Sequence, residues 1–458
     1  MHQYVIFYGA AALAVVVWFF TFRYGPARVP LLPILGLVLG GLVLWTWQVS
    51  EPSVLFSDFN VAYYPAGRAI VEDLPHLFVR CWDTPVCGFV NIPIVALLFT
   101  PFSFLTLRHA QWLLMGLSAV SLAMSLALLW SLTDRAWSRR WAMLLLFAMN
   151  GPLVYSLKEG NLTHFALFLL IAGVVCLDKT WDRRAGICFA LAAIIKLPLL
   201  LFAIYFFGKR RWAVMFGYGA TLVTVTVLSL WYAGWASHVE WYREVIMPFP
   251  NKGLPAFNVQ SIQGVLLRLQ DDAKLYDWKP VEVGGAVKVA ERACAALFVG
   301  LSGLVFLRRP GAQVRETTYL ELSMVLCLAL IISPISWSHY YLLLLLPLSL
   351  YVGNRLPVAS HGGWAVGMSL CLLLISPPVI FPGQEVVAAS PIATLFLSQY
   401  VVGAILLWGL FGYARWSVAA ATRLRLVIAD SGAPAPVRAD LPHEFDEPLR
   451  DLPKRAHS

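Results

Sequence analysis

The chain has 458 residues, of which 59% are hydrophobic and only 13% are charged, and its mean hydropathy is +0.72. This composition excludes a soluble globular protein, because no soluble domain of this length tolerates so much apolar surface. The formal net charge is +9, but the Lys and Arg residues cluster in a few short loops, as cytoplasmic loops do under the positive-inside rule. We therefore expect no nucleic-acid partner. Apolar runs of about 20 residues recur from end to end and predict an all-α polytopic membrane protein.

The first two apolar runs set the orientation of the chain. They extend from Tyr4 to Phe22 and from Leu31 to Trp47, and the loop between them carries Arg23 and Arg28. Short loops that carry Arg are retained inside, so we expect the N-terminus outside. No basic residue precedes the first run and no small-residue cleavage site follows it, so we interpret it as a retained span rather than a signal peptide.

A polar stretch follows the second run and contains residues of the types that take part in catalysis. It places Asp58 at the mouth of a span, with Tyr63, Tyr64 and Arg68 within roughly three helical turns. One interpretation of Asp58 is a cap for the following helix, although Ser57 can fill that position too. The other is catalysis, because a carboxylate with a pKa of about 3.9 is ionised and can accept a proton from a sugar hydroxyl.

The later apolar runs complete a predicted membrane domain, residues 1–414, with about eleven crossings in all. We expect these further crossings over His109 to Trp130, Trp141 to Leu157, Thr163 to Leu177, Trp212 to Trp235, Ala295 to Leu307, Tyr319 to Trp337, Tyr340 to Val352, Trp364 to Phe381 and Ile392 to Ala414. The basic loops between them place the C-terminus inside. Pro93 and Pro101 interrupt the run from Phe89 to Leu107, which we interpret as an interfacial or re-entrant pair of helices.

Three segments differ from simple crossings. The run from Ala185 to Phe207 has basic clusters at both ends, although a single crossing would put one cluster outside. Because Lys196 and Pro198 lie at its middle, we predict two half-helices that form a re-entrant hairpin open to the cytoplasm. We expect a long polar loop from about His238 to Glu291, and a cytoplasmic, largely disordered tail over residues 415–458.

Polar residues from separate parts of the chain are all expected on the outer side of the membrane. They are Asp58, Glu159, Asn161, Asn258, Gln260, Ser261, Ser338 and His339. Chance would scatter such residues over both faces, so their common side predicts one extracytoplasmic cavity. We expect extracytoplasmic amphipathic helices in the segment between Glu51 and Gly88.

Several of these residues also have a structural interpretation. Lys196 costs roughly 2.5 to 3.5 kcal/mol near the middle of a span, and it either snorkels to the cytoplasmic face or serves as a phosphate counter-ion, which we favour. Arg68 has the same two interpretations, and a solvated interfacial arginine is the simpler one. A lone His such as His339 is more often a residue of the interfacial belt than a ligand. The run from Asn258 to Ser261 could be a helix cap, and Glu159 could be a second catalytic carboxylate.

The cysteines predict neither a disulfide scaffold nor a metal centre. Cys81 and Cys87 fall in the polar loop after Asp58, close enough to bridge, and an extracytoplasmic loop permits a disulfide there. The other five lie in or beside apolar runs and are interpreted as inert packing residues: Cys176, Cys188, Cys294, Cys327 and Cys371. No second His or Cys lies at metal-ligand spacing from His339, so we expect no metal.

Four motifs resemble glycosyltransferase family 87 of the GT-C superfamily, which includes mycobacterial polyprenyl-phosphate-mannose-dependent mannosyltransferases. In chain order they are Asp58-Phe59 through Tyr63-Tyr64-x-Ala66-Gly67-Arg68-Ala69, Ala185-Gly186 through Lys196-x-Pro198 to Lys209-Arg210-Arg211-Trp212, Asn258-x-Gln260-Ser261 through Leu267-Arg268-Leu269, and Ser333-Pro334-Ile335-Ser336-Trp337-x-His339. Each motif alone is a weak signal, but four in this order are fairly specific. The resemblance covers roughly residues 50 to 350.

The resemblance implies a GT-C fold in the bacterial plasma (inner) membrane with an extracytoplasmic active site. The donor would be a polyprenyl-phosphate sugar, most commonly mannose, and the acceptor a glycolipid or glycan, with no cofactor and with the protein acting as a monomer. Asp58 matches the general base of an inverting transfer, and His339 matches a histidine near the donor phosphate, where Lys196 and Arg68 are further candidates. Our candidates for substrate binding are Tyr63, Tyr64, Glu159, Asn161, Asn258, Gln260, Ser261 and Trp337.

The sequence departs from the family pattern in three places, which bear on substrate identity more than on reaction class. A Glu159-Gly160-Asn161 turn replaces the usual Gly-Gln-Asn type, an additional insert separates Asn258 from Gln260, and an extra span precedes the usual first one. The alternative from another class is a transporter or flippase of a lipid-linked saccharide, because broken helices and an intramembrane Lys fit such a protein too. However, we find no inverted internal repeat. A purely structural scaffold does not explain the polar cluster.

Overall fold

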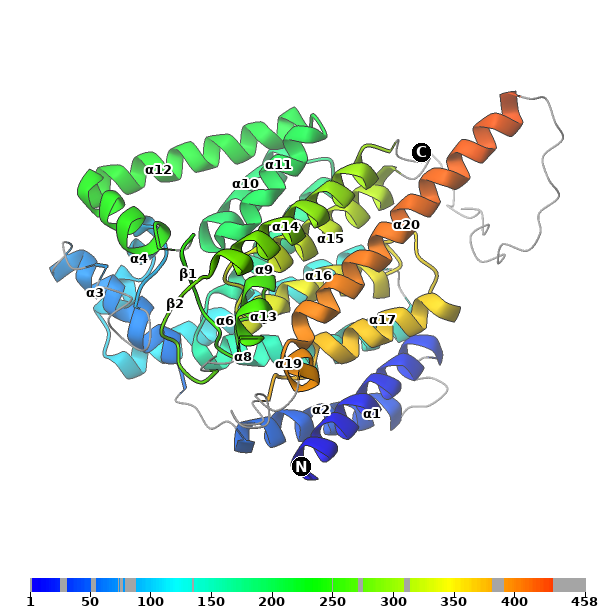
Figure 1. Ribbon diagram of the computed structural model, residues 1–458, viewed down its shortest axis with the longest axis horizontal. Helices are drawn as coiled ribbons and strands as arrows, with labels where there is room; N and C mark the ends of the chain where they lie inside the picture. Colours follow the sequence, from blue (N-terminus) through cyan, green and yellow to red (C-terminus); the bar gives the residue numbers. More distant parts are fainter. Residues whose placement is uncertain are drawn as a thin grey trace, which may run out of the picture.

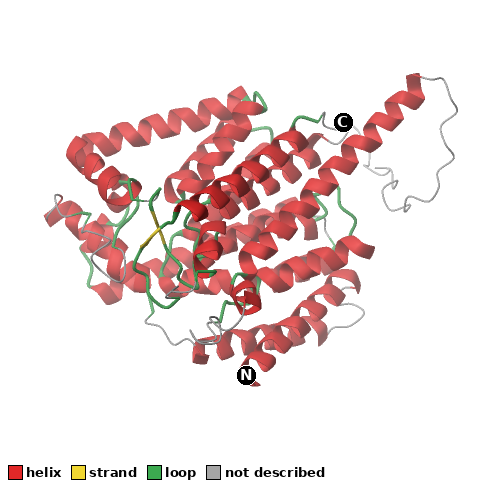
Figure 2. Ribbon diagram, in the orientation of Figure 1, coloured by secondary structure: helices red, strands yellow, loops and turns green. Residues whose placement is uncertain are grey.

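The structure is a computed structural model, and it describes residues 2–24, 31–50, 55–72, 74, 77–78, 88–133, 136–248, 250–270, 275–308, 314–380 and 391–430. Most of this part of the chain is helical, and it contains one small antiparallel pair of strands (Figure 2). The expected disulfide between Cys81 and Cys87 and residues 431–458 of the expected tail lie outside the described residues.

The first half of the chain begins at the lower edge of Figure 1, passes through the left side and reaches the upper centre of the view. Its elements are α1 (His2–Tyr24), α2 (Leu31–Ser50), the π-helix η1 (Phe59–Tyr63), α3 (Tyr64–Glu72), α4 (Pro93–Leu97), α5 (Thr100–Ser103), α6 (Leu107–Leu132), α7 (Trp137–Ala148), α8 (Gly151–Glu159), α9 (Thr163–Asp178), α10 (Asp182–Ile195), the 3₁₀ helix η3 (Leu197–Leu200) and α11 (Leu201–Gly208). The remaining elements are α12 (Trp212–Trp241), the π-helix η4 (Tyr242–Ile246), β1 (Lys252–Gly253), α13 (Ile262–Arg268), β2 (Val281–Glu282), α14 (Gly285–Phe306), α15 (Val314–Ile332), the 3₁₀ helix η5 (Ser338–Leu344), α16 (Leu345–Val352), α17 (Gly362–Ile375), α19 (Pro391–Leu397) and α20 (Gln399–Asp430).

The helices have the length and composition of a polytopic membrane protein, as the composition predicts. Within the described residues, five helical segments are long and apolar enough to cross a membrane: Ile6–Tyr24, Leu107–Leu132, Trp212–Ile246, Gly285–Phe306 and Gln399–Val418. Large apolar side chains point outward from them, including Trp231, which is 81% exposed, and Trp235, which is 73% exposed. An apolar exterior of this kind is stable in lipid and not in water. The exact number of crossings stays a prediction.

The predicted hairpin of two half-helices is present. The helix α10 ends at Ile195, Lys196 has an extended backbone, and the chain turns back through η3 and α11. The two ends of the segment meet, because Arg211 forms an ion pair with Asp182 at 2.9 Å. Both basic clusters therefore lie at the same end of the bundle, which resolves the charge conflict noted in the sequence.

The run from Phe89 to Leu107 also folds as predicted, into the two short helices α4 and α5. Each begins with a proline in its first turn, where the missing N–H costs nothing. At 1.5 Å per residue neither helix approaches the roughly 30 Å thickness of the hydrocarbon core.

The predicted crossing from Trp141 to Leu157 is wrong in detail, because it is broken into α7 and α8. Asn150 caps the second helix by accepting a hydrogen bond from the Leu153 N–H at 2.8 Å. Pro152 occupies the first turn of α8, and the Gly151 N–H donates to the Ser376 carbonyl at 2.6 Å rather than to a helical partner. A capping side chain followed by Gly and Pro starts a new helix.

Two other boundaries need correction. The expected polar loop from about His238 to Glu291 is shorter than predicted and partly structured. The helix α12, which is kinked at Gly234, ends at Trp241, α14 begins at Gly285, and η4, β1, α13 and β2 lie between them. The first turns of α14 carry polar side chains that bind that segment, as Glu291 does by accepting from Gln263 at 3.0 Å. The tail was expected from Arg415 onward, but α20 continues to Asp430 and projects beyond the bundle (Figure 1).

The helix α20 continues through Arg415 because this side chain is fully buried in a network of charged groups. We call this network the Glu321 network. Glu321 accepts hydrogen bonds from Arg415 Nε and Lys209 Nζ, each at 2.8 Å, and from the Tyr205 hydroxyl at 2.9 Å. Arg415 also donates to the Arg308 carbonyl at 2.6 Å. The network joins α11, α14, α15 and α20 at the end of the bundle where the basic clusters lie.

Candidate active site

Asp58 lies just before η1 and is held by a side chain from a distant part of the chain. The Asn161 amide nitrogen donates to Asp58 Oδ2 at 2.6 Å. The Asp58 carboxylate makes no capping hydrogen bond to the helix that follows, so the capping interpretation is wrong. Burial raises the pKa of Asp58, and the Asn161 hydrogen bond and the positive charge of Lys196 oppose that rise.

Asn161 is fixed in orientation by the tight turn between α8 and α9. Its Oδ1 accepts from the Thr163 N–H at 3.0 Å, from the Thr163 hydroxyl at 2.6 Å and from Lys196 Nζ at 3.1 Å. The amide nitrogen is therefore left to face Asp58. The turn needs Gly160, because its φ is +67° and a Cβ there would lie 2.8 Å from Cβ of Phe59.

Lys196 forms the tip of the hairpin, and its ammonium points toward the Asp58 region. In addition to its bond to Asn161, Nζ lies 4.1 Å from the centroid of the Tyr340 ring, a cation–π contact. The helix break leaves the Ile195 carbonyl without its helical partner, and the Asn91 amide donates to it at 3.1 Å. Lys196 therefore does not snorkel back to the end of the bundle that carries the basic clusters.

His339 is buried at the start of η5. Its ring lies 5.1 Å from that of Tyr340 and 5.9 Å from that of Tyr155, measured between centroids. Neither ring nitrogen has a hydrogen-bond partner in the described part of the chain. A buried polar group without a partner costs about 1–3 kcal/mol, so this imidazole is available to a ligand.

Glu159 is a second buried carboxyl group beside Asp58. Only 7% of the residue is exposed. Burial, together with the negative charge of Asp58, raises the pKa of Glu159 to about 8. At neutral pH this side chain is mostly a neutral acid, which can donate a hydrogen bond as well as accept one.

The motif at Asn258 lies directly against the motif at Trp337. Val259 and Trp337 form an isolated antiparallel bridge, and the Ser338 N–H donates to the Asn258 carbonyl at 2.8 Å. Trp337 is half-buried. Two motifs separated by more than seventy residues in the sequence therefore form one wall beside His339.

The three polar side chains of the Asn258 motif, those of Asn258, Gln260 and Ser261, have different partners. Gln260 donates to the Phe257 and Leu397 carbonyls at 2.9 and 2.7 Å, and Ser261 caps α13 by accepting from the Gly264 N–H at 3.1 Å. Both hold the backbone in place. Asn258 instead extends to Tyr155, whose hydroxyl accepts from its amide at 3.3 Å.

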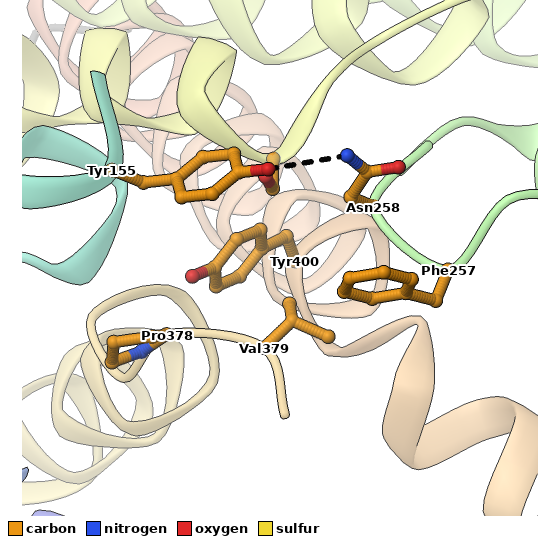
Figure 3. A pocket seen from close by; sticks show the side chains of 7 residues that line it. Tyr155, Phe257, Asn258, Pro378, Val379 and Tyr400 are labelled. Carbon is orange, nitrogen blue, oxygen red and sulfur yellow. Dashed lines mark hydrogen bonds between the residues drawn. The ribbon is translucent and has the colours of Figure 1, made fainter. Parts of the chain in front are cut away.

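A small hollow lies beside this Asn258–Tyr155 pair (Figure 3). Its walls are Tyr155, Phe257, Asn258, Ser338, Pro378, Val379 and Tyr400. Tyr155 and Tyr400 reach toward it from α8 and α20, and the Tyr400 hydroxyl is held by the Pro377 carbonyl at 2.8 Å.

Three sequence candidates have other contacts. Tyr63 stacks on Phe99 with ring centroids 4.8 Å apart, and the Tyr64 hydroxyl donates to the Leu105 carbonyl at 2.8 Å. Arg68 forms a 3.0 Å ion pair with Glu72, and both side chains are at least half exposed. The structure thus places Tyr63 next to Asp58 as packing for η1 and does not bring Arg68 into the buried cluster.

Sequence reasoning missed Tyr155, Tyr340, Thr163 and Asn91. Tyr340 follows His339 directly in the sequence, and this position next to a candidate residue was the only signal that could have identified it. Tyr155 and Asn91 carry no motif of their own. Among the residues that the structure describes, no group of three or more His, Cys, Asp or Glu side chains is placed to hold a metal ion.

Comparison with known proteins identifies the family. The model of glycosyltransferase family 87 matches residues 89–334, which is more than half of the chain. The chain belongs to glycosyltransferase family 87. The protein is therefore a glycosyltransferase, and the sequence resemblance is confirmed. The family match lies between Asp58 and His339 and contains neither.

Two mycobacterial relatives within this enzyme class extend the similarity over most of the chain. Each is named a polyprenol-phosphate-mannose-dependent alpha-(1-2)-phosphatidylinositol mannoside mannosyltransferase. The Mycolicibacterium smegmatis protein is 26% identical over 446 residues, 91% of this chain and 93% of its own length. The Mycobacterium tuberculosis protein is 26% identical over 358 residues, 70% of this chain and 79% of its own length.

Proposed function

We propose that the protein transfers a mannosyl residue from polyprenyl phosphate to a hydroxyl group of a glycolipid or glycan acceptor, at the extracytoplasmic face of a bacterial plasma membrane. The names of the two relatives support the donor and a lipid-linked acceptor. The observation that carries the proposal is the chain of side chains Asp58, Asn161 and Lys196, in which an amide bridges an acid and a buried cation.

Asp58 serves as the general base. Asn161 occupies Oδ2, and no described side chain bonds to Oδ1, which leaves that oxygen for the acceptor hydroxyl. Burial raises the pKa of Asp58 and so makes the carboxylate a better base. As the acceptor oxygen attacks the anomeric carbon, its proton passes to Asp58. Base assistance of this kind contributes about 10² to 10⁴ in rate.

Lys196 and His339 receive the leaving phosphate. Both lie near the Tyr340 ring: the Lys196 ammonium is 4.1 Å from its centroid, and the centroid of the His339 imidazole is 5.1 Å from it. As the bond between the anomeric carbon and the phosphate oxygen breaks, the electron pair stays on the phosphate. A fixed cation and a hydrogen-bond donor stabilise that growing charge. Polyprenyl phosphate is a stable anion, so the departure needs no resident metal.

We further propose that the transfer inverts the anomeric configuration. Asp58 would act on the acceptor side of the sugar, and Lys196 and His339 on the phosphate side. A single displacement with the acceptor on one side of the sugar and the phosphate on the other inverts the anomeric carbon.

The hairpin supports the extracytoplasmic location. Its two basic ends lie together, as the Arg211–Asp182 pair shows, and basic ends are retained in the cytoplasm. The tip with Lys196 reaches in the opposite direction to Asn161 and Asp58. The cluster therefore lies away from the cytoplasmic end of the bundle.

The test is transfer by the purified protein in proteoliposomes. Radiolabelled polyprenyl-phosphate mannose and mannosylated phosphatidylinositol are supplied together, and product is followed by mass spectrometry and by NMR of the new anomeric centre. We expect a product whose configuration is opposite to that of the donor. Movement of the lipid-linked sugar across the bilayer without any product would instead establish the flippase alternative.

A further inference from the structure

Four exposed cations lie where the chain enters α10 and α12. We call them the basic patch: Lys179, Arg183, Arg184 and Arg210. We propose that the basic patch binds the phosphate headgroup of an anionic phospholipid. This lipid is a component of the surrounding membrane and not a substrate, so the site is independent of the proposed function.

The two turns that carry the patch are held together in a fixed arrangement. Arg211, just before α12, pairs with Asp182, the first residue of α10, at 2.9 Å. The two helices also touch through their backbones, because a Cβ on Gly217 of α12 would collide with the Arg183 carbonyl of α10. The helices α10, α11 and α12 lie together in the upper part of Figure 1. The patch therefore has a rigid base.

The cations of the patch have no countercharge in the described part of the chain. The two acids of the turn between α9 and α10 are already occupied. Asp182 pairs with Arg211, and Asp178 pairs with Arg315 and Arg355. Like charges gathered without an anion repel one another, and an anion bound among them removes that repulsion.

Aromatic rings hold three of the four cations in place. Lys179 Nζ lies 5.0 Å and Arg184 Cζ 4.8 Å from the centroid of the Trp181 ring. Arg183 Cζ lies 5.2 Å from the centroid of the Phe216 ring. Such cation–π contacts restrict long side chains before a ligand arrives, which lowers the ordering cost of binding. Guanidinium groups bind phosphate oxygens through paired hydrogen bonds.

The rings beside the patch favour a lipid over a soluble anion. Trp212 and Phe216 lie in the first two turns of the apolar segment Trp212–Ile246, which is long enough to cross a membrane. They are 59% and 65% exposed, and Phe207 of α11 is 59% exposed. Cations next to exposed aromatic rings at the start of a span are typical of the level at which headgroups meet acyl chains.

The patch lies at the opposite end of the hairpin from the reacting centre. The helix α10 begins at Asp182 and ends at Ile195, just before Lys196. A phospholipid at the patch would therefore contact neither Asp58 nor Lys196. We expect it to stabilise the base of the hairpin.

Native mass spectrometry of the purified protein in detergent tests the proposal without requiring transfer. The protein is titrated with phosphatidylglycerol, and with phosphatidylcholine as the zwitterionic reference. We expect wild type to bind one phosphatidylglycerol about tenfold more tightly than phosphatidylcholine. Arg184→Gln should weaken phosphatidylglycerol binding about fivefold or more. The matched control is Arg23→Gln, which removes an exposed cation at the end of α1 and should leave binding unchanged.

Trp181→Leu distinguishes a specific site from diffuse surface charge. This variant keeps the net charge and removes the ring that holds Lys179 and Arg184, so it should also weaken phosphatidylglycerol binding. Thermal unfolding of each variant in detergent checks that it is folded. Phosphatidylglycerol should raise the Tm of wild type more than that of Arg184→Gln. Arg183→Gln provides a second charge variant with the same expected loss of affinity.

Three results would overturn the lipid site. Wild type would bind the two lipids equally, the folded patch variants would bind phosphatidylglycerol as wild type does, or Arg23→Gln would lose as much affinity as Arg184→Gln. Two competitors identify other anions. Displacement of the lipid by an equal concentration of inorganic phosphate would assign the patch to a soluble anion. Binding of polyglutamate to wild type but not to Arg184→Gln, without any lipid preference, would assign it to an acidic protein segment.

Discussion

The two ends of the bundle differ in how completely their buried polar and charged groups are hydrogen-bonded. In the Glu321 network both carboxylate oxygens are bonded, to Lys209, Arg415 and Tyr205, and among the buried side-chain polar atoms of these four residues only Arg415 Nη1 lacks a partner in the described part of the chain. At the Asp58 end, one carboxylate oxygen and both nitrogens of His339 have no partner in the described part of the chain. Both regions are buried, so burial alone does not account for the difference.

The difference separates a structural role from a binding role. A buried acid whose two carboxylate oxygens are both bonded by the protein fixes the packing of helices and offers no oxygen to a ligand. An incompletely paired one costs stability in the empty protein, and that cost is recovered when a ligand supplies the missing partners. The predictions below test this contrast by removing groups from each end.

The largest effect on stability is expected for Glu321→Gln. Arg415 would then be fully buried, and Lys209 partly buried, without a countercharge, and breaking a buried pair in this way typically costs about 3–5 kcal/mol. Thermal unfolding in detergent should show a large drop in Tm, while the remaining folded protein keeps its transfer rate. An unchanged Tm would mean that the network does not hold α11, α15 and α20 together.

Lys196→Met should give the opposite result. Transfer should fall by roughly 10² to 10³, the usual effect of removing one group that stabilises developing charge. Tm should fall less than in Glu321→Gln, because Asp58 keeps its hydrogen bond to Asn161 and the lost cation is replaced by an apolar side chain of similar length. Donor and acceptor kinetics with Tm on the same samples provide the measurement. A variant with normal turnover would remove Lys196 from the phosphate site.

Glu159→Gln should change the pH dependence of stability. Because the pKa of Glu159 is raised from 4.5 to about 8 in the folded protein, the folded state keeps a proton that the unfolded chain releases. Wild-type stability should therefore fall as pH rises from about 5 to 8, by up to ~1.4 kcal/mol per pH unit. The variant should lack this component. Tm measured from pH 5 to 9 tests it, with Glu72→Gln as an exposed control; parallel curves would refute the assignment.

The smallest effect is expected for Arg68→Ala. Arg68 and Glu72 are half exposed and four residues apart on a helix, and solvent-exposed pairs of this kind contribute little to stability. Transfer kinetics and Tm should both stay close to wild type. A large rise in donor KM would instead restore Arg68 as a phosphate ligand.

The sequence predicted the membrane class, the hairpin and part of the site because each depends on local chemistry. Conflicting basic clusters and a Lys-x-Pro break predicted the hairpin around Lys196. The alternation of basic loops along the chain predicted that Asp58 and Asn161 lie on the same side of the membrane. In the structure the Asn161 amide nitrogen donates to Asp58 Oδ2 at 2.6 Å. These features follow from hydropathy, charge and proline, which a single sequence displays.

The remainder depended on contacts that a sequence does not display. The break at Asn150 is stabilised in part by the distant Ser376 carbonyl, and α20 continues past Arg415 because Glu321 on α15 pairs with it. Tyr340 enters the site only because the hairpin tip packs on its ring. Each of these outcomes was decided by tertiary packing.

The central claim is that Asp58 accepts the proton of the acceptor hydroxyl. The most direct measurement is single-turnover transfer by Asp58→Asn, with donor binding and Tm recorded on the same preparation. An Asn keeps the shape of the side chain and loses the base. We expect the rate to fall at least about 10²-fold, with donor affinity and Tm close to wild type. Transfer within a few-fold of wild type by this variant would contradict the account.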